Sequence, residues 1–183
     1  MKKNGNRSKT NRVSVSIALV GIMAAIVECG KLALSFIPNV EVVSLFLALF
    51  SYVFGGLGLA AALIFVCIEP LIWGFGTWVF SYFIYWPLVS FVFFFFGKLK
   101  IKSRFIITPS IMVLTFFFGI LSSLVDIGLL SGFFDNFWYR FGIYYARGIV
   151  FYVVHIVSNT VIFFFVFPFL SKKLGEIKKR IFD

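Results

Sequence analysis

The stretch that decides the fold is residues 42–97, which read VVSLFLALFSYVFGGLGLAAALIFVCIEPLIWGFGTWVFSYFIYWPLVSFVFFFFG and contain one charged side chain, Glu69. A single membrane crossing takes about 20 apolar residues, so this run is too long for one span. Two glycine-dense breaks, Gly55–Gly58 and Gly74–Thr77, divide it. Glycine clusters interrupt helices, so the sequence predicts three helices here, over 42–54, 57–73 and 78–97, and the first of them is short.

Three further apolar runs, at about 13–37, 107–130 and 143–170, raise the expected number of spans to six. The chain is 61% hydrophobic and 13% charged, with a mean hydropathy of +1.04. Too few charged side chains remain to cover a water-soluble surface, so a soluble fold is excluded. We expect an all-α integral membrane bundle of six transmembrane helices over residues 13–170. A basic N-terminal segment, 1–12, and a basic C-terminal segment, 171–183, flank it.

The positive charge is concentrated beside these runs. All Lys and Arg residues except Lys31, Arg140 and Arg147 lie before residue 13, at 98–104 or after Leu170. Short basic segments next to membrane spans stay on the cytoplasmic side. Six spans place all three clusters and both termini in the cytoplasm, whereas five would leave two clusters outside. The net charge of +10 is thus explained by topology and does not indicate a nucleic-acid partner.

Charged side chains inside the expected spans are candidates for function. They are Glu28, Lys31, Glu69, Asp126 and Arg147. Each costs about 2.5–3.5 kcal/mol at the membrane centre, so such residues usually have a functional reason. In the six-span topology all five lie in the outer half, which predicts a shared polar chamber. The alternatives are positions near the outer headgroups and simple pairing, as between Glu28 and Lys31 on one helical face.

Aromatic side chains with polar tips gather at the same level. Trp73 ends one expected span, and Trp78, Tyr82, Tyr85 and Trp86 share a face of the next. An interfacial aromatic belt accounts for one or two of them. A one-sided group is more typical of a pocket for a flat or large heterocyclic solute.

Three more segments supply candidate binding residues on the outer side. In the last span Tyr144, Arg147, His155 and Asn159 form one helical stripe, although His155 and Asn159 are also typical of structural contacts between helices. The loop 131–142 carries Trp138 and Arg140 and is long enough to cover a chamber. Asn39 and Glu41, in the loop after Pro38, are expected either to cap the next helix or to contact the solute.

The inner part of the first span carries a strip of small residues, Ser14, Ala18, Gly21 and Ala25, at spacings of 4, 3 and 4. Small side chains let another helix approach closely. The sequence leaves open whether that helix belongs to this chain or to a separate subunit.

Motifs for catalysis and nucleotide binding are absent from the sequence. There is no G-x-x-x-x-G-K-[ST] loop for ATP, no G-x-S-x-G and no H-E-x-x-H. We therefore expect neither an enzyme nor a metal or cofactor. Cys29 and Cys67 fall in separate spans without metal-ligand spacing and are expected to pack in the interior.

Together these features resemble the substrate-binding S components of energy-coupling factor (ECF) vitamin transporters. The residues that carry the likeness are Ile37–Val43, Ile68–Gly76, Tyr82–Pro87 and Gly148–Asn159. The resemblance implies a bacterial plasma-membrane protein that binds a vitamin or related micronutrient and works with a transmembrane coupling subunit and two cytoplasmic ATPases. In that family the small-residue strip, usually Ala-x-x-x-Ala, contacts the coupling subunit, and the bound protein is thought to topple in the membrane.

Within the family the likeness leans toward cobalamin-type members, with riboflavin, pantothenate, a pyridoxine-like vitamin and a queuosine precursor as other candidates. Two different functions compete with this interpretation. One is a structural or assembly protein of the cell envelope. The other is a self-sufficient ion-coupled transporter in which Glu69, Asp126 and His155 relay protons.

Overall fold

The structure, a computed structural model, describes the backbone of residues 3–182 and their side chains except those of residues 3–11 and 131. The described chain is helical and has no strand, which confirms the all-α prediction. Its six helices are α1 (Lys3–Leu34), α2 (Val43–Phe54), α3 (Gly56–Trp73), α4 (Trp78–Lys98), α5 (Arg104–Ser131) and α6 (Phe137–Phe182).

The two glycine-dense breaks end helices as predicted. Gly55 separates α2 from α3 with φ +67°, and Gly74 ends α3 with φ +82°. Both angles lie in the left-handed region, which glycine adopts without a steric penalty. Gly58 has a different role, because a Cβ there would collide with the backbone of Phe50 and Ser51. Its missing side chain lets α3 return directly against α2.

The helices at the two ends of the chain are longer than the expected spans. α6 has 46 residues and continues through Pro168 into the basic C-terminal segment. The expected loop 131–142 is reduced to 132–136, because α5 runs to Ser131 and α6 begins at Phe137. The basic N-terminal segment is helical from Lys3, and its side chains before Arg12 lie outside the described part.

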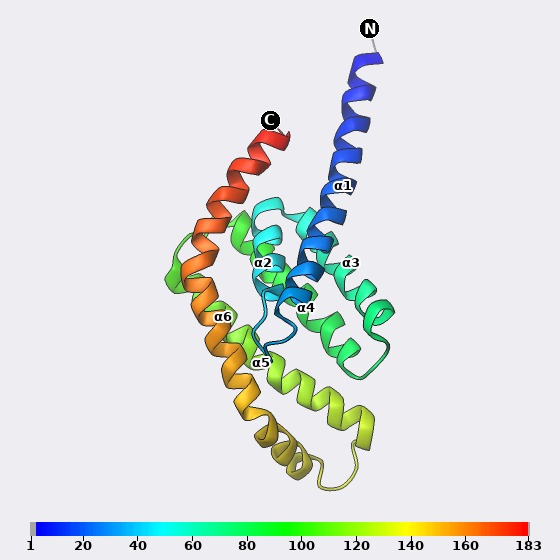
Figure 1. The fold of residues 1–183 in the computed structure, drawn as a ribbon, viewed down its shortest axis with the longest axis vertical. Coiled ribbons are helices and arrows are strands. Elements are labelled where there is room, and N and C mark those ends of the chain that lie inside the picture. Colours follow the sequence, from blue (N-terminus) through cyan, green and yellow to red (C-terminus); the bar gives the residue numbers. More distant parts are fainter. Residues whose placement is uncertain (1–2, 183) are drawn as a thin grey trace.

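α2 stands in the middle of the bundle, in contact with α1, α3, α4 and α6 (Figure 1). It has 12 residues, nine of them buried. At 1.5 Å per residue it is about 18 Å long, which is shorter than the roughly 30 Å membrane core. The other five helices all contain apolar segments long enough to cross a membrane.

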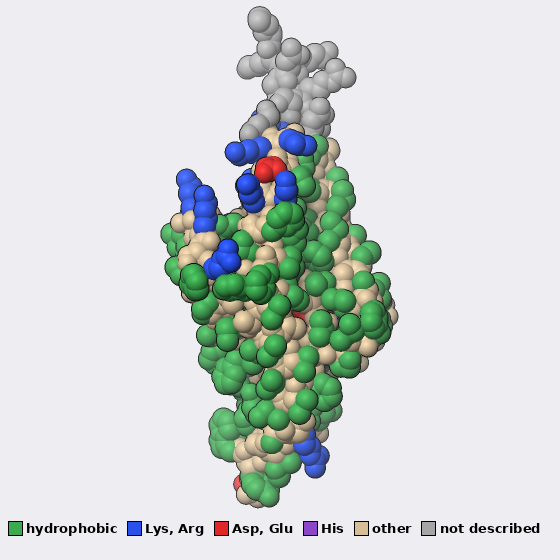
Figure 2. Space-filling view, turned by 60° about the vertical axis from the view of Figure 1, so that its left-hand side comes forward, with side chains coloured by type: hydrophobic (Ala, Val, Ile, Leu, Met, Phe, Trp, Pro, Cys, Tyr) green, Lys and Arg blue, Asp and Glu red, His purple; other side chains and the backbone are tan. Residues whose placement is uncertain are grey.

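Both ends of the chain lie at one end of the bundle, and the hairpin of α5 and α6 extends beyond the other helices at the opposite end (Figure 1). Figure 2 shows Lys and Arg gathered at the end that carries the termini. The described basic side chains of these clusters are all exposed: Arg12, Lys98, Lys100, Lys102, Arg104, Lys172, Lys173, Lys178, Lys179 and Arg180. We refer to this as the basic end.

The surface between the two ends is apolar. Large hydrophobic side chains on all the long helices are exposed, among them Ile17, Leu63, Phe91, Val113 and Phe165 (Figure 2). Cys29 and Cys67 are exposed on this surface too, so the prediction that they pack in the interior was wrong. An apolar belt of this extent suits contact with lipid, and the chain is built as a multi-pass membrane protein.

Candidate functional site

The short α2 leaves space inside the bundle. α2 runs beside α6 from His155 to Phe167. At the start of α2, Glu41 is hydrogen-bonded to His155, and near its end Tyr52 packs edge-on against the ring of Phe167. α3 and α4, with 18 and 21 residues, extend beyond the start of α2. The chain between α1 and α2 is therefore recessed, and it forms the floor of a cavity.

This cavity, which we call the aromatic cavity, has a volume of about 400 Å³. All six helices contribute to its wall or floor, α2 only through its first turn. The lining residues are Lys31, Leu34, Ser35, Ile37, Pro38, Asn39, Val40, Glu41, Val43, Trp73, Trp78, Tyr82, Trp86, Phe118 and His155.

Glu41 fastens the floor of the cavity. One carboxylate oxygen accepts a hydrogen bond from the backbone N of Ser44 at 2.8 Å, which caps the first turn of α2. The other lies 3.1 Å from His155 Nε2 and accepts from Asn159 Nδ2 at 2.9 Å. Glu41 thus caps α2, one of the two predicted roles, and it also lines the cavity.

The surroundings of Glu41 favour its charged form. Burial raises its pKa, but hydrogen bonding and charge attraction from His155, with the bonds to Ser44, outweigh burial and bring the pKa below its ordinary value of 4.5. His155 is itself buried and stands edge-on to the Phe118 ring. Glu41 is therefore ionised at neutral pH, beside His155 on the α6 side of the site.

Lys31 supplies the opposite charge on the other side. Its ammonium group pairs with the fully buried carboxylate of Glu69 on α3. It also lies 5.0 Å from the ring centroid of Trp73 and 5.5 Å from that of Tyr82, within cation–π range. The alternative of a Lys31–Glu28 pair is not the one formed, since Lys31 pairs with Glu69, and Glu28 accepts a hydrogen bond from Trp73 Nε1 at 3.3 Å.

Three aromatic side chains of α4 form one wall. Trp78 and Tyr82 have ring centroids 5.0 Å apart, and Tyr82 and Trp86 5.5 Å apart, in edge-to-face contact. Their spacing of four residues places them on one face of the helix, as the sequence predicted. Tyr85 is buried behind this wall, against Trp86 and Phe118.

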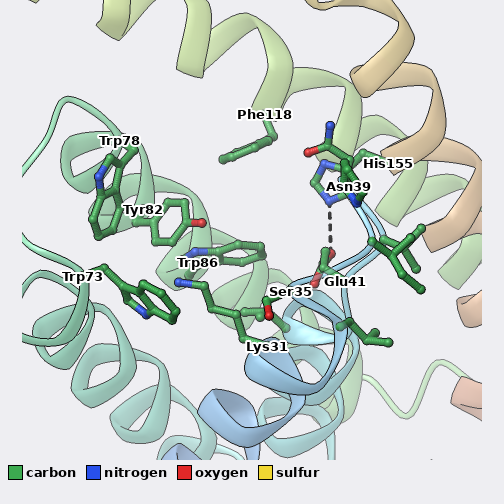
Figure 3. Close-up of a pocket in the computed structure, with 15 residues that line it drawn as sticks. Lys31, Ser35, Asn39, Glu41, Trp73, Trp78, Tyr82, Trp86, Phe118 and His155 are labelled. Atoms are coloured by element: carbon green, nitrogen blue, oxygen red, sulfur yellow. Dashed lines mark hydrogen bonds and ion pairs between the residues drawn. The ribbon is translucent and has the colours of Figure 1, made fainter.

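The polar and aromatic groups face each other across the cavity (Figure 3). Lys31, Trp73, Trp78 and Tyr82 lie on one side and Asn39, Glu41 and His155 on the other. Trp86 Nε1 is buried and has no hydrogen-bond partner in the described part of the chain. The cavity therefore offers flat apolar faces to a bound molecule, with the paired charges of Lys31 and Glu41 on opposite sides.

The predicted binding residues separate into those that line the cavity and those behind its walls. Asn39, Glu41, Trp73, Trp78, Tyr82, Trp86 and His155 line it. Glu69, Tyr85 and Asn159 are fully or almost fully buried behind them. Asn159 holds Glu41 and is bonded to Thr115, and Glu69 holds Lys31.

The remaining predicted residues lie elsewhere. Asp126 accepts hydrogen bonds from Thr77 and from Tyr144, the latter at 2.9 Å. Trp138 and Arg147 are exposed on α6, and the turn 132–136 does not reach the cavity. Arg140 donates to the carbonyl of Gly132 at 2.9 Å and so holds that turn together. The loop 131–142 was expected to cover the chamber, but none of its residues is in the described cavity wall. α5 and α6 extend into this segment, and the turn that remains is too short to reach the cavity.

The sequence placed Lys31 in the polar chamber without identifying its partner, and it did not indicate Ser35 or Phe118, although all three side chains line the cavity. The i, i+3 spacing of Glu28 and Lys31 favoured a local pair and concealed the partner on α3. Phe118 is one of 28 phenylalanines, and nothing in its sequence surroundings distinguishes it.

The small-residue strip faces away from the bundle. Ser14, Ala18, Gly21 and Ala25 are all exposed, while Val20, Met23, Ala24 and Val27 on another face of α1 pack into the core. A Cβ added at Gly21 would meet no atom within 4 Å. Among the residues that the structure describes, no helix of this chain covers the strip.

Comparison of the chain with protein families, curated proteins and solved structures found no match. The geometry of the aromatic cavity and of the exposed strip is the basis for assigning a function.

Proposed function

We propose that the protein captures a small, flat, polar solute in the aromatic cavity, as the substrate-binding S component of an ECF-type importer of a vitamin or related micronutrient. Six spans with both termini in the cytoplasm are part of this proposal. The observation that carries it is the cavity itself, in which three aromatic rings of α4 face a carboxylate and a histidine.

The lining supports a heterocyclic solute. Ligand sites are mostly apolar, with a few fixed polar groups that set orientation. Here Trp78, Tyr82 and Trp86 offer ring faces and edges, and Glu41 is held by three hydrogen bonds, so it does not have to be ordered on binding. Such preorganisation lowers the entropic cost of capture.

The volume of about 400 Å³ favours a solute of one to three rings. It lies near the lower end of the usual range for ligand sites, about 300–1,000 Å³. A corrinoid such as cobalamin is much larger than this space. Among the candidates suggested by the resemblance, we therefore favour a pyridoxine-like vitamin, a flavin or a queuosine precursor over a cobalamin-type solute.

The proposed topology is supported by the common location of the termini and the basic clusters (Figure 2). Fusions of a cytoplasmic fluorescent reporter to the C-terminus and after Lys100 should both be active, whereas alkaline phosphatase should be active only in the three outer connections, the α1–α2 loop and the α3–α4 and α5–α6 turns. Active phosphatase at the C-terminus would contradict six spans.

The proposed partners are a transmembrane coupling subunit and two cytoplasmic ATPases, because the chain has no ATP-binding loop of its own. The exposed small-residue strip on α1 is the proposed contact with the coupling subunit. A proton relay through Glu69, Asp126 and His155 is less well supported, because these three residues are not bonded to one another. Glu69 pairs with Lys31, Asp126 accepts from Thr77 and Tyr144, and His155 is bonded to Glu41.

The test is to purify the protein in detergent, release bound small molecules with denaturant and identify them by mass spectrometry. We expect a heterocyclic micronutrient near one equivalent. If no solute is recovered, and none from a panel of vitamins and their precursors raises the unfolding temperature, the proposal is wrong.

A further inference from the structure

A second cavity, which we call the basic cavity, lies at the opposite end of α2 from the aromatic cavity. Its volume is about 420 Å³, and α2, α5, α6 and the α4–α5 turn form its walls. Its lining residues include Tyr52, Lys102, Ile107, Phe167, Ser171 and Lys172.

The walls of this cavity are fastened by hydrogen bonds between distant segments. Tyr52 Oη donates to the carbonyl of Ile101 at 2.8 Å, which ties α2 to the α4–α5 turn. Lys178 Nζ donates to the carbonyl of Val53 at 2.7 Å, which ties the end of α6 to α2. The cavity is therefore part of the fold and does not depend on the position of one loose side chain.

The cavity is apolar at its base and cationic at its rim. Ile107 and Phe167 are buried, whereas Lys102 and Lys172 are exposed. No carboxylate is among the lining residues, and neither lysine has an ion-pair partner within the described chain. The neighbouring Lys173 differs, because it pairs with Glu176 at 3.5 Å.

The rim coincides with the edge of the apolar belt. Lys102 lies in the turn just before α5 begins at Arg104, and Lys172 follows the last apolar turn of α6, which ends near Leu170. An occupant that matches this cavity has an apolar part directed into the membrane and an anionic group at its surface. Basic pockets between transmembrane helices at the membrane surface suit acidic lipid headgroups.

We propose that the basic cavity binds one anionic phospholipid, with its phosphate between Lys102 and Lys172 and the start of an acyl chain against Ile107 and Phe167. This site is separate from the aromatic cavity and does not depend on the proposed uptake function. It requires only that the basic end lie at a membrane surface.

The first experiment compares lipids on the purified full-length protein by native mass spectrometry in detergent. The probes are phosphatidylglycerol, phosphatidylcholine with the same acyl chains, and glycerol phosphate. We expect retention of one phosphatidylglycerol, several-fold weaker retention of phosphatidylcholine, and no competition by glycerol phosphate at equal concentration. Equal retention of both lipids would show nonspecific lipid binding and overturn the proposal. Full competition by glycerol phosphate would overturn it too, because the cavity would then be a site for a free anion.

Variants then locate the lipid. Lys102→Gln with Lys172→Gln should weaken phosphatidylglycerol retention by roughly 30-fold, since each basic side chain near an anionic surface adds to the affinity. The matched control, Lys100→Gln with Lys173→Gln, removes the same charge outside the cavity and should change retention less than about threefold. A similar loss in both double variants would overturn the assignment to this cavity.

A third variant separates the cavity from its charge. Ser171→Phe keeps both lysines and places a ring in the cavity, so it should reduce retention of phosphatidylglycerol about tenfold. Retention equal to that of the unmodified protein would show that the lysines act as a surface patch, and the proposal would fail. The comparison of lipids on the unmodified protein decides the matter even if a variant does not fold.

Discussion

At the scale of single residues, the aromatic cavity depends on two kinds of side chain. Glu41 and Lys31 are held by partners on other helices, and they fix the charges of the site. Trp78 and Tyr82 are only partly buried, and they supply the surface that a solute can contact. Substitutions in the first group should change stability, whereas substitutions in the second should change binding.

Glu41→Gln should lower the free energy of unfolding by about 1–2 kcal/mol at pH 7, because the charge-assisted bonds from Ser44, His155 and Asn159 are weakened. The folded-state pKa of Glu41 lies below its ordinary value of 4.5. Its contribution is thus complete above that value and is lost as the pH falls through the lower folded pKa. The variant should not show this acid loss, which thermal unfolding in detergent between pH 7 and pH 3 measures.

The matched control is Glu176→Gln, because Glu176 pairs with Lys173 on the surface, where both side chains are about half exposed. Exposed pairs contribute little, so this variant should unfold like the unmodified protein. Equal behaviour of the two variants at every pH would contradict the role given to Glu41.

Trp78→Ala should weaken binding of the captured solute about tenfold, because an aromatic contact is lost from the cavity wall. Trp138→Ala serves as the control, since Trp138 is 73% exposed and lies away from the cavity. The solute retained through purification gives the measurement. If both variants retain as much as the unmodified protein, the solute does not occupy the aromatic cavity.

At the scale of helices, the length of α2 decides where the cavity forms. Its 12 residues run from Val43 to Phe54, and Gly58 lets α3 turn back in close contact. A full-length helix in this position would fill the space between α1, α4 and α6. The late start of α2 at Val43, after the α1–α2 loop, thus leaves the space that becomes the cavity.

Gly58→Ala should lower the free energy of unfolding by about 1–3 kcal/mol, because its Cβ would collide with the backbone of Phe50 and Ser51. Gly56→Ala is the control in the same turn, since a Cβ there meets nothing within 4 Å. Alanine favours the helix, so Gly56→Ala should be neutral or slightly stabilising. Thermal unfolding in detergent separates the two, and equal stability would contradict the close approach of α2 and α3.

At the scale of the whole molecule, three regions have separate positions. The aromatic cavity lies toward the α3–α4 turn, the basic cavity lies toward the termini, and the small-residue strip lies on the outside of α1. Binding of solute, binding of lipid and contact with a coupling subunit can therefore be altered independently.

Ala18→Trp should leave solute binding within about twofold of the unmodified protein and reduce uptake in cells to the background level. Ala18 is exposed on α1, and a large side chain there would keep a partner helix at a distance. Leu63→Trp, at a 54% exposed position on α3, should leave both activities unchanged. Normal uptake by the Ala18 variant would show that the strip is not the coupling surface.

Much of the architecture follows from the sequence alone. Composition excludes a soluble fold, and the glycine clusters give the ends of α2 and α3, because both effects act over a few consecutive residues. The four-residue spacing also gives the shared face of Trp78, Tyr82 and Trp86. Spacing along one helix determines which side chains lie together on that helix.

Only the tertiary structure decided what each face meets. Lys31 pairs with Glu69 on α3 and leaves Glu28 to Trp73, while Phe118 joins the cavity from α5. The stripe on α6 is buried at His155 and exposed at Arg147, because the α5–α6 hairpin extends past α2 (Figure 1). These outcomes depend on the lengths and relative heights of packed helices, which no periodicity within one segment encodes.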